Sequence, residues 1–327
     1  MKKLIHVPRF LFLLGLLALA SCKKENVEPA DLSKFYRLKS FEVGVIPEHR
    51  QVRILFQVTD YYRKGVATLT KDDFIVSENK GRIDTEADIR LSRDSIPFDI
   101  KTVLLLDVSR SVEGLVPQLK TAAKALIQKK LPEQEIAIYT FDADTKKVKD
   151  FSADQSALLA AIESIPEHGL VNSTNLYGAV MEVADLWEDE YSLDGITDGS
   201  LIIFTDGRHN ATQALTLASA KNALGDRRAY VAALASVDLD EVALKELAGE
   251  EDRYFKADDV AGLEQMFLDI QTEIQSLSKS IYFLYYTSPI SDPSPFENEL
   301  TIEVKGNINN GFDRRILEMF NSEGFGN

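Results

Sequence analysis

Between Lys101 and Ser280 the sequence alternates short, continuous apolar runs with segments long enough to form amphipathic helices. The apolar runs are 102–106, 136–141, 201–205 and 230–234, and the helices are expected at 114–130, 155–165, 176–190, 212–223, 240–247 and 260–277. A strand that is apolar at every position is buried on both faces, which happens when helices cover both sides of a sheet. Strands that alternate with helices favour parallel pairing. The sequence therefore predicts an α/β domain with a doubly wound, mostly parallel sheet.

The segments on either side of this block have β character. Residues 53–59, 73–77, 281–286 and 299–304 are rich in β-branched and aromatic side chains and are bounded by turn-forming residues. Two C-terminal strands cannot form a stable sheet alone, so we expect them to pair with the N-terminal strands. The predicted architecture is an α/β domain at 100–280, inserted into an antiparallel β-sandwich made of 34–99 and 281–327.

The N-terminus has the pattern of a secretory signal. Lysines and an arginine at positions 2, 3 and 9 precede an apolar run at 10–20, which is shorter than the roughly 20 residues a helix needs to cross a bilayer. The sequence Leu19-Ala20-Ser21-Cys22 resembles a bacterial lipobox, in which the cysteine becomes the lipidated first residue, and Cys22 is the only cysteine of the chain. We therefore expect a signal peptide at 1–21, lipidation at Cys22 and a polar tether at 22–33. An ordinary cleavage site before a soluble secreted protein is the alternative.

Lipidation would place the chain in a bacterial cell envelope, held to the membrane by its lipid anchor. The residue after the cysteine is Lys23 and not Asp, which by resemblance to lipoprotein sorting rules favours the outer membrane.

Composition excludes several classes of function. Asp and Glu number 52 against 37 Lys and Arg, for a formal net charge of −15, and this balance repels nucleic acid. One cysteine and four scattered histidines leave no Cys-rich or His-rich metal site, so a metal ion would have to be bound by oxygen. The chain also has no Walker-type phosphate loop and no Ser-His-Asp arrangement at catalytic spacing.

Polar residues with ion-binding chemistry follow two of the predicted strands and precede one helix. Asp107, Ser109 and Ser111 end the first strand, Asp206 ends the strand at 201–205, and Thr174 lies in the loop before the helix at 176. Ligands of open α/β folds collect at the carboxyl edge of the sheet. Asp and Ser are also common in turns and helix caps, so each segment alone is a weak signal.

Taken together and in this order, the three segments resemble the von Willebrand factor type A domain with its metal-ion-dependent adhesion site. The resemblance covers about 100–280 and implies that Asp107, Ser109, Ser111, Thr174 and Asp206 hold the ion, some directly and some through water. Carboxylates and hydroxyls form a hard, all-oxygen site suited to Mg²⁺, with Mn²⁺ or Ca²⁺ as alternatives. An ion whose coordination sphere the chain only partly fills can accept a carboxylate from a partner.

These features predict a non-enzymatic binding protein that contacts a protein or other macromolecular ligand through a Mg²⁺-bridged carboxylate, for adhesion or envelope assembly. A metal-assisted hydrolase is an alternative, with His209 as the candidate general base, although a solvated loop histidine is the commoner case. A structural envelope module without a metal-dependent ligand is the second alternative. Asp198 is a candidate ligand for a second ion, although an acidic residue beside a turn glycine is the commoner case. Trp187 and Tyr191 are expected to be packing residues rather than a ligand cradle.

The last predicted helix of the α/β domain runs directly into the strand at 281–286. In related domains this helix shifts when an external carboxylate completes the ion site, so the resemblance implies a possible route to the second domain. A rigid module with a fixed helix is the alternative.

Overall fold

The protein is described by a computed structural model that covers residues 32–83, 88–91, 96–168, 171–211, 215–237, 239–290 and 297–325. The predicted signal peptide, the lipidation site at Cys22 and most of the predicted tether lie outside these residues. Contacts divide the chain between Leu32 and Ser33, and the fold belongs to Ser33–Asn327. No helix within the described residues is long and apolar enough to span a membrane.

A seven-stranded sheet forms the centre of the α/β domain. Its strands are β6 (Phe98–Asp107), β7 (Gln134–Phe141), β8 (Thr145–Ser152), β9 (Glu190–Tyr191), β10 (Ile196–Thr205), β11 (Ala229–Leu234) and β12 (Tyr254–Ala257). The order is β12-β11-β10-β6-β7-β8, and β9 pairs with the start of β10. Neighbouring strands pair in parallel, except that β8 is antiparallel to β7 and β9 is antiparallel to β10. The predicted mostly parallel sheet is confirmed.

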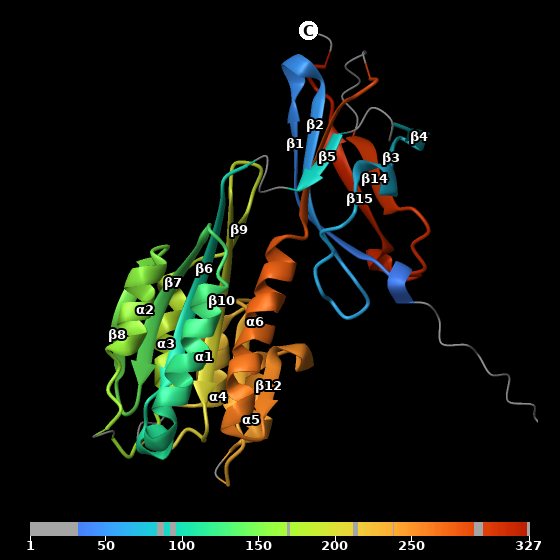
Figure 1. Ribbon diagram of the computed structural model, residues 1–327. Coiled ribbons are helices and arrows are strands. Elements are labelled where there is room, and N and C mark those ends of the chain that lie inside the picture. Colours follow the sequence, from blue (N-terminus) through green and yellow to red (C-terminus); the bar gives the residue numbers. More distant parts are fainter. Residues whose placement is uncertain are drawn as a thin grey trace, which may run out of the picture. The chain divides into compact units, whose positions relative to one another are not determined.

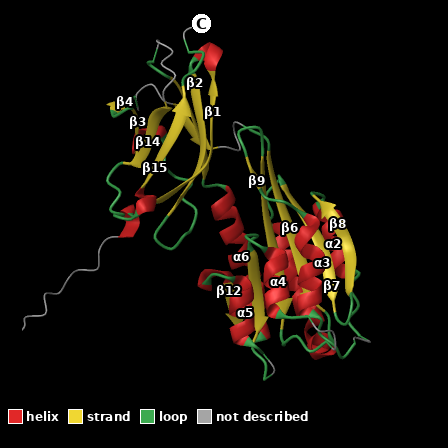
Figure 2. Ribbon diagram, turned by 180° about the vertical axis from the view of Figure 1, so that it is seen from behind, coloured by secondary structure: helices red, strands yellow, loops and turns green. Residues whose placement is uncertain are grey.

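Helices cover both faces of this sheet. They are α1 (Val116–Gln128), α2 (Gln155–Glu163), α3 (Leu176–Val183), α4 (Leu217–Leu224), α5 (Glu241–Ala248) and α6 (Leu263–Ser278). One core cluster contains side chains of α1, α2 and α6, and a second contains those of α3, α4 and α5. Figure 1 shows α1 and α6 on the near side of the sheet, and Figure 2 shows α3 and α4 from the other side.

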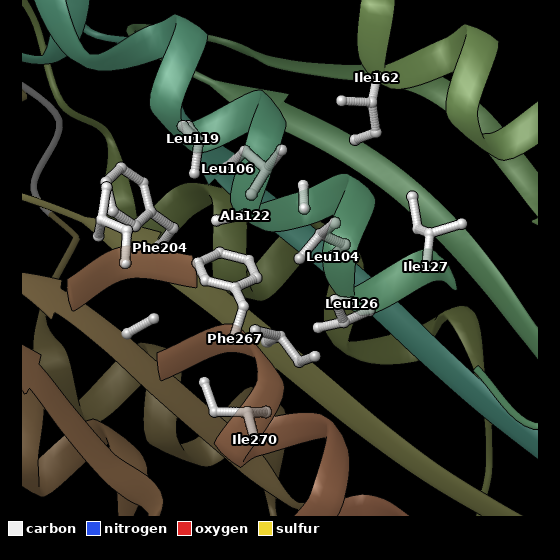
Figure 3. Packing of buried hydrophobic residues seen from close by; sticks show 14 of the residues in the cluster. Leu104, Leu106, Leu119, Ala122, Leu126, Ile127, Ile162, Phe204, Phe267 and Ile270 are labelled. Carbon is white, nitrogen blue, oxygen red and sulfur yellow. The ribbon is translucent and has the colours of Figure 1, made fainter. Parts of the chain in front are cut away.

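Alternation along the central strand divides its side chains between these two layers. Leu104 and Leu106 of β6 join the α1–α6 layer, whereas Val103 and Leu105 join the opposite one. In the first layer Phe204 of β10 and Phe267 of α6 lie with ring centroids 6.3 Å apart (Figure 3). Both rings are fully buried. Side chains buried on alternate faces explain why the strands read as continuous apolar runs.

Two four-stranded sheets form the second structural part. Their strands are β1 (Arg37–Ile46), β2 (Gln51–Thr59), β3 (Phe74–Glu78), β4 (Gly81–Arg82), β5 (Asp88–Leu91), β13 (Ile281–Thr287), β14 (Glu297–Val304) and β15 (Arg315–Asn321). The orders are β1-β2-β13-β5 and β15-β14-β3-β4, with antiparallel pairing. Each sheet combines strands from before and after the α/β domain, which confirms the predicted insertion. Phe56, Phe74 and Tyr282 pack together between the sheets, with centroid separations of 5.5 to 5.7 Å.

The structure differs from the sequence expectation at several elements. Strand β8 was not predicted, because its lysine-rich sequence has no apolar run; lysines at an edge strand prevent pairing with other chains. Helix α3 ends at Val183 rather than 190, since the chain passes through a 3-10 turn and becomes extended at Trp187. A third C-terminal strand, β15, completes the second sheet of the sandwich.

The end of α6 is joined to the sandwich by hydrogen bonds as well as by the chain. The Val58 amide donates to the carbonyl of Ser280 at 3.1 Å, and Gln57 Nε2 donates to the carbonyl of Leu277 at 3.1 Å. At Gly65 a Cβ atom would lie only 2.0 Å from the carbonyl oxygen of Ser276. The loop after β2 therefore contacts the α6 backbone at a position where no side chain fits.

Candidate metal-ion site

Three loops meet at the carboxyl edge of the sheet, and backbone contacts fix them to one another. The Arg110 amide, after β6, donates to the carbonyl of Val171 at 2.9 Å. The Asn210 amide, after β10, donates to the carbonyl of Thr174 at 3.0 Å, and Asn210 Oδ1 accepts from the Thr174 amide at 2.7 Å. These hydrogen bonds join the segment after β6 to the loop before α3, and that loop to the segment after β10. The side chains of the three segments are therefore held close together.

Four of the five predicted ligands line one cavity at this edge. The cavity has a volume of about 310 Å³, and its walls include Ser109, Ser111, Thr174 and Asp206. Ser111 Oγ donates to Asp206 Oδ1 at 2.8 Å and lies 3.1 Å from Ser109 Oγ. Oxygen atoms from the segment after β6, from the loop before α3 and from the segment after β10 therefore line the same space.

Asp107, the fifth predicted ligand, is fully buried beneath the cavity and is not one of its wall residues. Its Oδ1 accepts from the Ser109 amide at 2.8 Å and its Oδ2 accepts from Thr205 Oγ1 at 2.7 Å. Burial and, to a smaller extent, the charge of Asp206 raise its pKa to about 6, although these hydrogen bonds act to lower it. A cation between the two carboxylates would offset both causes of this raised pKa.

Thr205 is a functional neighbour that the sequence reasoning missed. Its hydroxyl donates to Asp107 and accepts from the Gly207 amide at 3.2 Å, so it connects the two motif segments. The signal was available, because a buried polar residue directly before Asp206 ends the apolar run at 201–204. Asn210, which holds the Thr174 loop, gave no signal beyond that of an ordinary turn residue.

The donor set fits a hard cation. Among the described residues, no group of three or more His, Cys, Asp or Glu side chains is placed to hold a metal ion. An ion at this edge would therefore depend on two carboxylates assisted by Ser109, Ser111 and Thr174 hydroxyls. All of these ligands are oxygen, which suits Mg²⁺ and the similar ions Mn²⁺ and Ca²⁺ better than softer metals.

His209 is packed rather than solvated, which differs from the expectation. Its ring stacks on Tyr177, with centroids 4.3 Å apart and planes at 18°, and its Nδ1 accepts from the Tyr177 amide at 3.4 Å. Burial lowers its pKa, and its Nε2 has no partner among the described residues. The ring is not part of the cavity wall. This position gives no support to His209 as the base of a hydrolase.

Asp198 is not the turn residue that the sequence suggested. It lies within β10, fully buried, and forms an ion pair of 2.6 Å with Arg228. Trp187 and Tyr191 are packing residues as expected: Trp187 is buried in the α3–α5 layer, and Tyr191 stacks on Phe41 with centroids 4.3 Å apart.

Comparison with known proteins gives a family for the α/β part. Residues 102–209 match the family model for the von Willebrand factor type A domain. Among curated proteins, no relative matches the sequence.

Several solved structures are similar to this chain. Proximal thread matrix protein 1 from the mussel byssus, in a structure with a zinc-occupied MIDAS motif, has 12% identity over 55% of this chain and 49% of its own, with a TM-score of 0.47. The vWF domain of the type V pili tip protein Mfa5 from Porphyromonas gingivalis has 14% identity over 55% of this chain and 96% of its own, with a TM-score of 0.45. A von Willebrand factor type A protein from Catenulispora acidiphila has 12% identity over 87% of this chain and 71% of its own, with a TM-score of 0.47. This chain spans about half the length of the mussel protein.

The family match begins within β6 and ends just after β10, so it contains all three segments that form the cavity. Together with the parallel sheet covered by helices on both faces, this match shows that the α/β part of the chain has the fold of a von Willebrand factor type A domain.

Proposed function

We propose that this chain is a non-enzymatic binding protein of a bacterial cell envelope, anchored by lipid at Cys22, that binds a protein or other macromolecular ligand in adhesion or envelope assembly. The contact is a divalent cation, Mg²⁺ in this proposal, held at the carboxyl edge of the sheet. A carboxylate of the partner completes its coordination.

The observation that carries this proposal is the convergence of Ser109, Ser111, Thr174 and Asp206 on one open cavity, with Asp107 buried beneath it. When bound, the ion supplies a positive centre that attracts an external carboxylate. Ser111 orients Asp206, and Thr205 and the Ser109 amide orient Asp107. The hydroxyl ligands are neutral, so they leave more of the ion's charge for the partner than carboxylates would.

The chain offers binding groups at this edge rather than groups that break bonds. Hydrolysis at a metal ion needs a base that can take a proton from water. The candidate, His209, is packed on Tyr177 away from the cavity wall. A binding role therefore agrees better with the geometry than a hydrolase does.

Calorimetric titration of the full-length protein with Mg²⁺ tests the ion site. We expect wild type to bind one ion, and Asp206→Ala and Ser111→Ala to bind it much more weakly. Asp150→Ala is the matched control, because Asp150 is an exposed acid on β8 that pairs with Lys147. Equal Mg²⁺ affinity in all four proteins would contradict the assignment.

Affinity capture from envelope extracts then tests the partner contact. The same partner should be retained by wild type and Asp150→Ala with Mg²⁺, and released by EDTA. Asp206→Ala should not retain it under either condition. A partner that stays bound in EDTA and to Asp206→Ala would show that binding does not use the ion. Mass spectrometry of the N-terminal peptide tests the anchor separately, since a free thiol at Cys22 would contradict lipidation.

A further inference from the structure

Arg208 lines the same cavity as the predicted ion ligands. It follows Asp206 by two residues, and the wall also includes Asn172 and Val237. The Arg208 side chain is exposed, and its guanidinium has no hydrogen bond or ion pair within the described part of the chain. Other arginines differ: Arg37, Arg227 and Arg228 each lie within ion-pair distance of a carboxylate.

A fixed positive charge in the wall of a cation site has an electrostatic cost. Arg208 carries a positive charge and lines the same cavity, so it repels a divalent ion bound there. The unpaired guanidinium lowers ion affinity while nothing else is bound. An anion that enters the cavity is attracted by the ion and by the guanidinium together. Arg208 then favours the complex, although it disfavours binding of the ion alone.

The divalent cation and the guanidinium of Arg208 bind carboxylates in different and complementary ways. A divalent cation takes one carboxylate oxygen as a ligand, whereas a planar guanidinium binds a carboxylate through two parallel N–H···O bonds. One carboxylate on the ion leaves the fork of Arg208 available for a second. Val237 is fully exposed beside these groups and offers an apolar surface that a peptide backbone or side chain can cover.

We infer that Arg208 forms a second anion subsite, and that the preferred ligand is a protein segment with two acidic side chains, one for the ion and one for Arg208. This inference rests on the proposed function, since the first acidic side chain needs the ion. It adds the class of partner and a contact that does not depend on the metal.

The test uses two blocked peptides as probes, with the sequences Gly-Asp-Gly-Asp-Gly and Gly-Asp-Gly-Asn-Gly, and follows their binding to the full-length protein by NMR titration with Mg²⁺. We expect wild type to bind the doubly acidic peptide about fivefold more tightly, the scale of one partly exposed ion pair. Arg208→Gln should abolish this preference, and Arg208→Lys should keep only part of it, because an ammonium lacks the planar fork.

The second readout is the affinity for Mg²⁺ without peptide. Loss of the Arg208 charge should weaken binding of the doubly acidic peptide but strengthen binding of Mg²⁺ alone. Arg208→Gln should bind Mg²⁺ about two- to threefold more tightly than wild type, because the repulsion is removed. Lys146→Gln is the charge-matched control: Lys146 is an exposed cation at the start of β8 that does not line the cavity, so both readouts should stay as in wild type.

The outcomes separate this inference from the proposed function. If wild type binds Mg²⁺ and both peptides with equal affinity, or if Arg208→Gln keeps the preference, the Arg208 subsite is wrong and the ion site stands. If wild type does not bind Mg²⁺, the proposed function and the inference both fail.

Discussion

Ser278 Oγ, at the last residue of α6, donates a hydrogen bond of 2.6 Å to Asp198 Oδ2 in the central strand β10. The other oxygen of Asp198 accepts from Arg228 Nη2 and from the Tyr191 hydroxyl, both at 2.6 Å. Burial would raise the pKa of Asp198, but Arg228 and these hydrogen bonds hold it below its usual value. The end of the helix is therefore attached to a buried ion pair at the opposite edge of the sheet from the ion site.

Removal of the charge of Asp198 is expected to destabilise the protein strongly. Asp198→Asn leaves Arg228 buried and without a counter-charge, which typically costs about 3 to 5 kcal/mol of unfolding free energy. Urea denaturation followed by circular dichroism measures the loss. Asp150→Asn, which breaks the exposed pair with Lys147, should cause no measurable change. A loss at position 198 no larger than at position 150 would show that the ion pair does not contribute.

Asp107 is expected to make the metal-free protein less stable at neutral pH. Its pKa is about 6 in the folded chain against 3.8 as the reference for the unfolded chain, so between these values only the folded form keeps the proton. Stability contributed by this group therefore falls as pH rises from about 4 to 6, and above pH 6 the charged form costs on the order of 3 kcal/mol.

Asp107→Asn tests this cost in urea denaturation with EDTA. The variant should be more stable than wild type by about 1 to 3 kcal/mol at pH 7.5, and the difference should shrink at pH 4.5. Added Mg²⁺ should stabilise wild type and have little effect on the variant. If Asp107→Asn is the less stable protein at pH 7.5 in EDTA, the hydrogen bonds to Ser109 and Thr205 outweigh the cost of the buried charge.

Local sequence patterns predicted the strands whose successive side chains are buried on opposite faces of the sheet. The runs at 102–106 and 201–205 are apolar because β6 and β10 are covered on both faces, and this burial leaves a direct trace in the sequence. The motif residues were also recognisable, since Asp107 and Asp206 end these two strands. Strand β8 has no such apolar run, because it lies at the edge of the sheet and none of its residues is buried.

Contacts between distant segments could not be predicted in the same way. Asp198 precedes Gly199, a local pattern that is typical of turns. Only the contact with Arg228, 30 positions later, makes it part of a buried ion pair. Arg208 had no pattern that distinguished it from a surface arginine, because its significance comes from sharing a cavity with Ser109 and Thr174. Such pairings depend on tertiary packing and not on local preference.

The close approach at Gly65 predicts a selective effect of alanine. A Cβ at Gly65 would meet the Ser276 carbonyl oxygen at 2.0 Å, so Gly65→Ala must displace the loop or α6. We expect a loss of about 1 to 3 kcal/mol in unfolding free energy, as for other overpacked positions. Gly114→Ala is the control, since a Cβ there meets nothing within 4 Å. Equal stability of the two variants would mean that the loop after β2 does not need its contact with α6.

The contacts along α6 predict that this helix stays in place when the ion site is filled. Besides the Ser278–Asp198 bond, Gln271 Nε2 donates to Gln134 Oε1 at 2.7 Å, and Gln134 in turn donates to Thr102 at 2.8 Å. An axial shift would break these buried bonds at a cost of about 1 to 3 kcal/mol for each group left unsatisfied. A ligand can offset that cost only through its differential affinity for the two helix positions.

Ser278→Ala lowers the cost of a shift while Asp198 keeps Arg228 and Tyr191 as partners. We expect this variant to bind the Gly-Asp-Gly-Asn-Gly peptide with Mg²⁺ within twofold of the wild-type affinity, and amide exchange in α6 to be the same with and without the peptide. The matched control is Thr272→Ala, which removes an exposed hydroxyl bonded only within the helix, to the Leu268 carbonyl. An affinity at least fivefold higher in Ser278→Ala but not in Thr272→Ala, with faster exchange near Ser278 on binding, would show instead that α6 moves and that its end carries the signal toward β13.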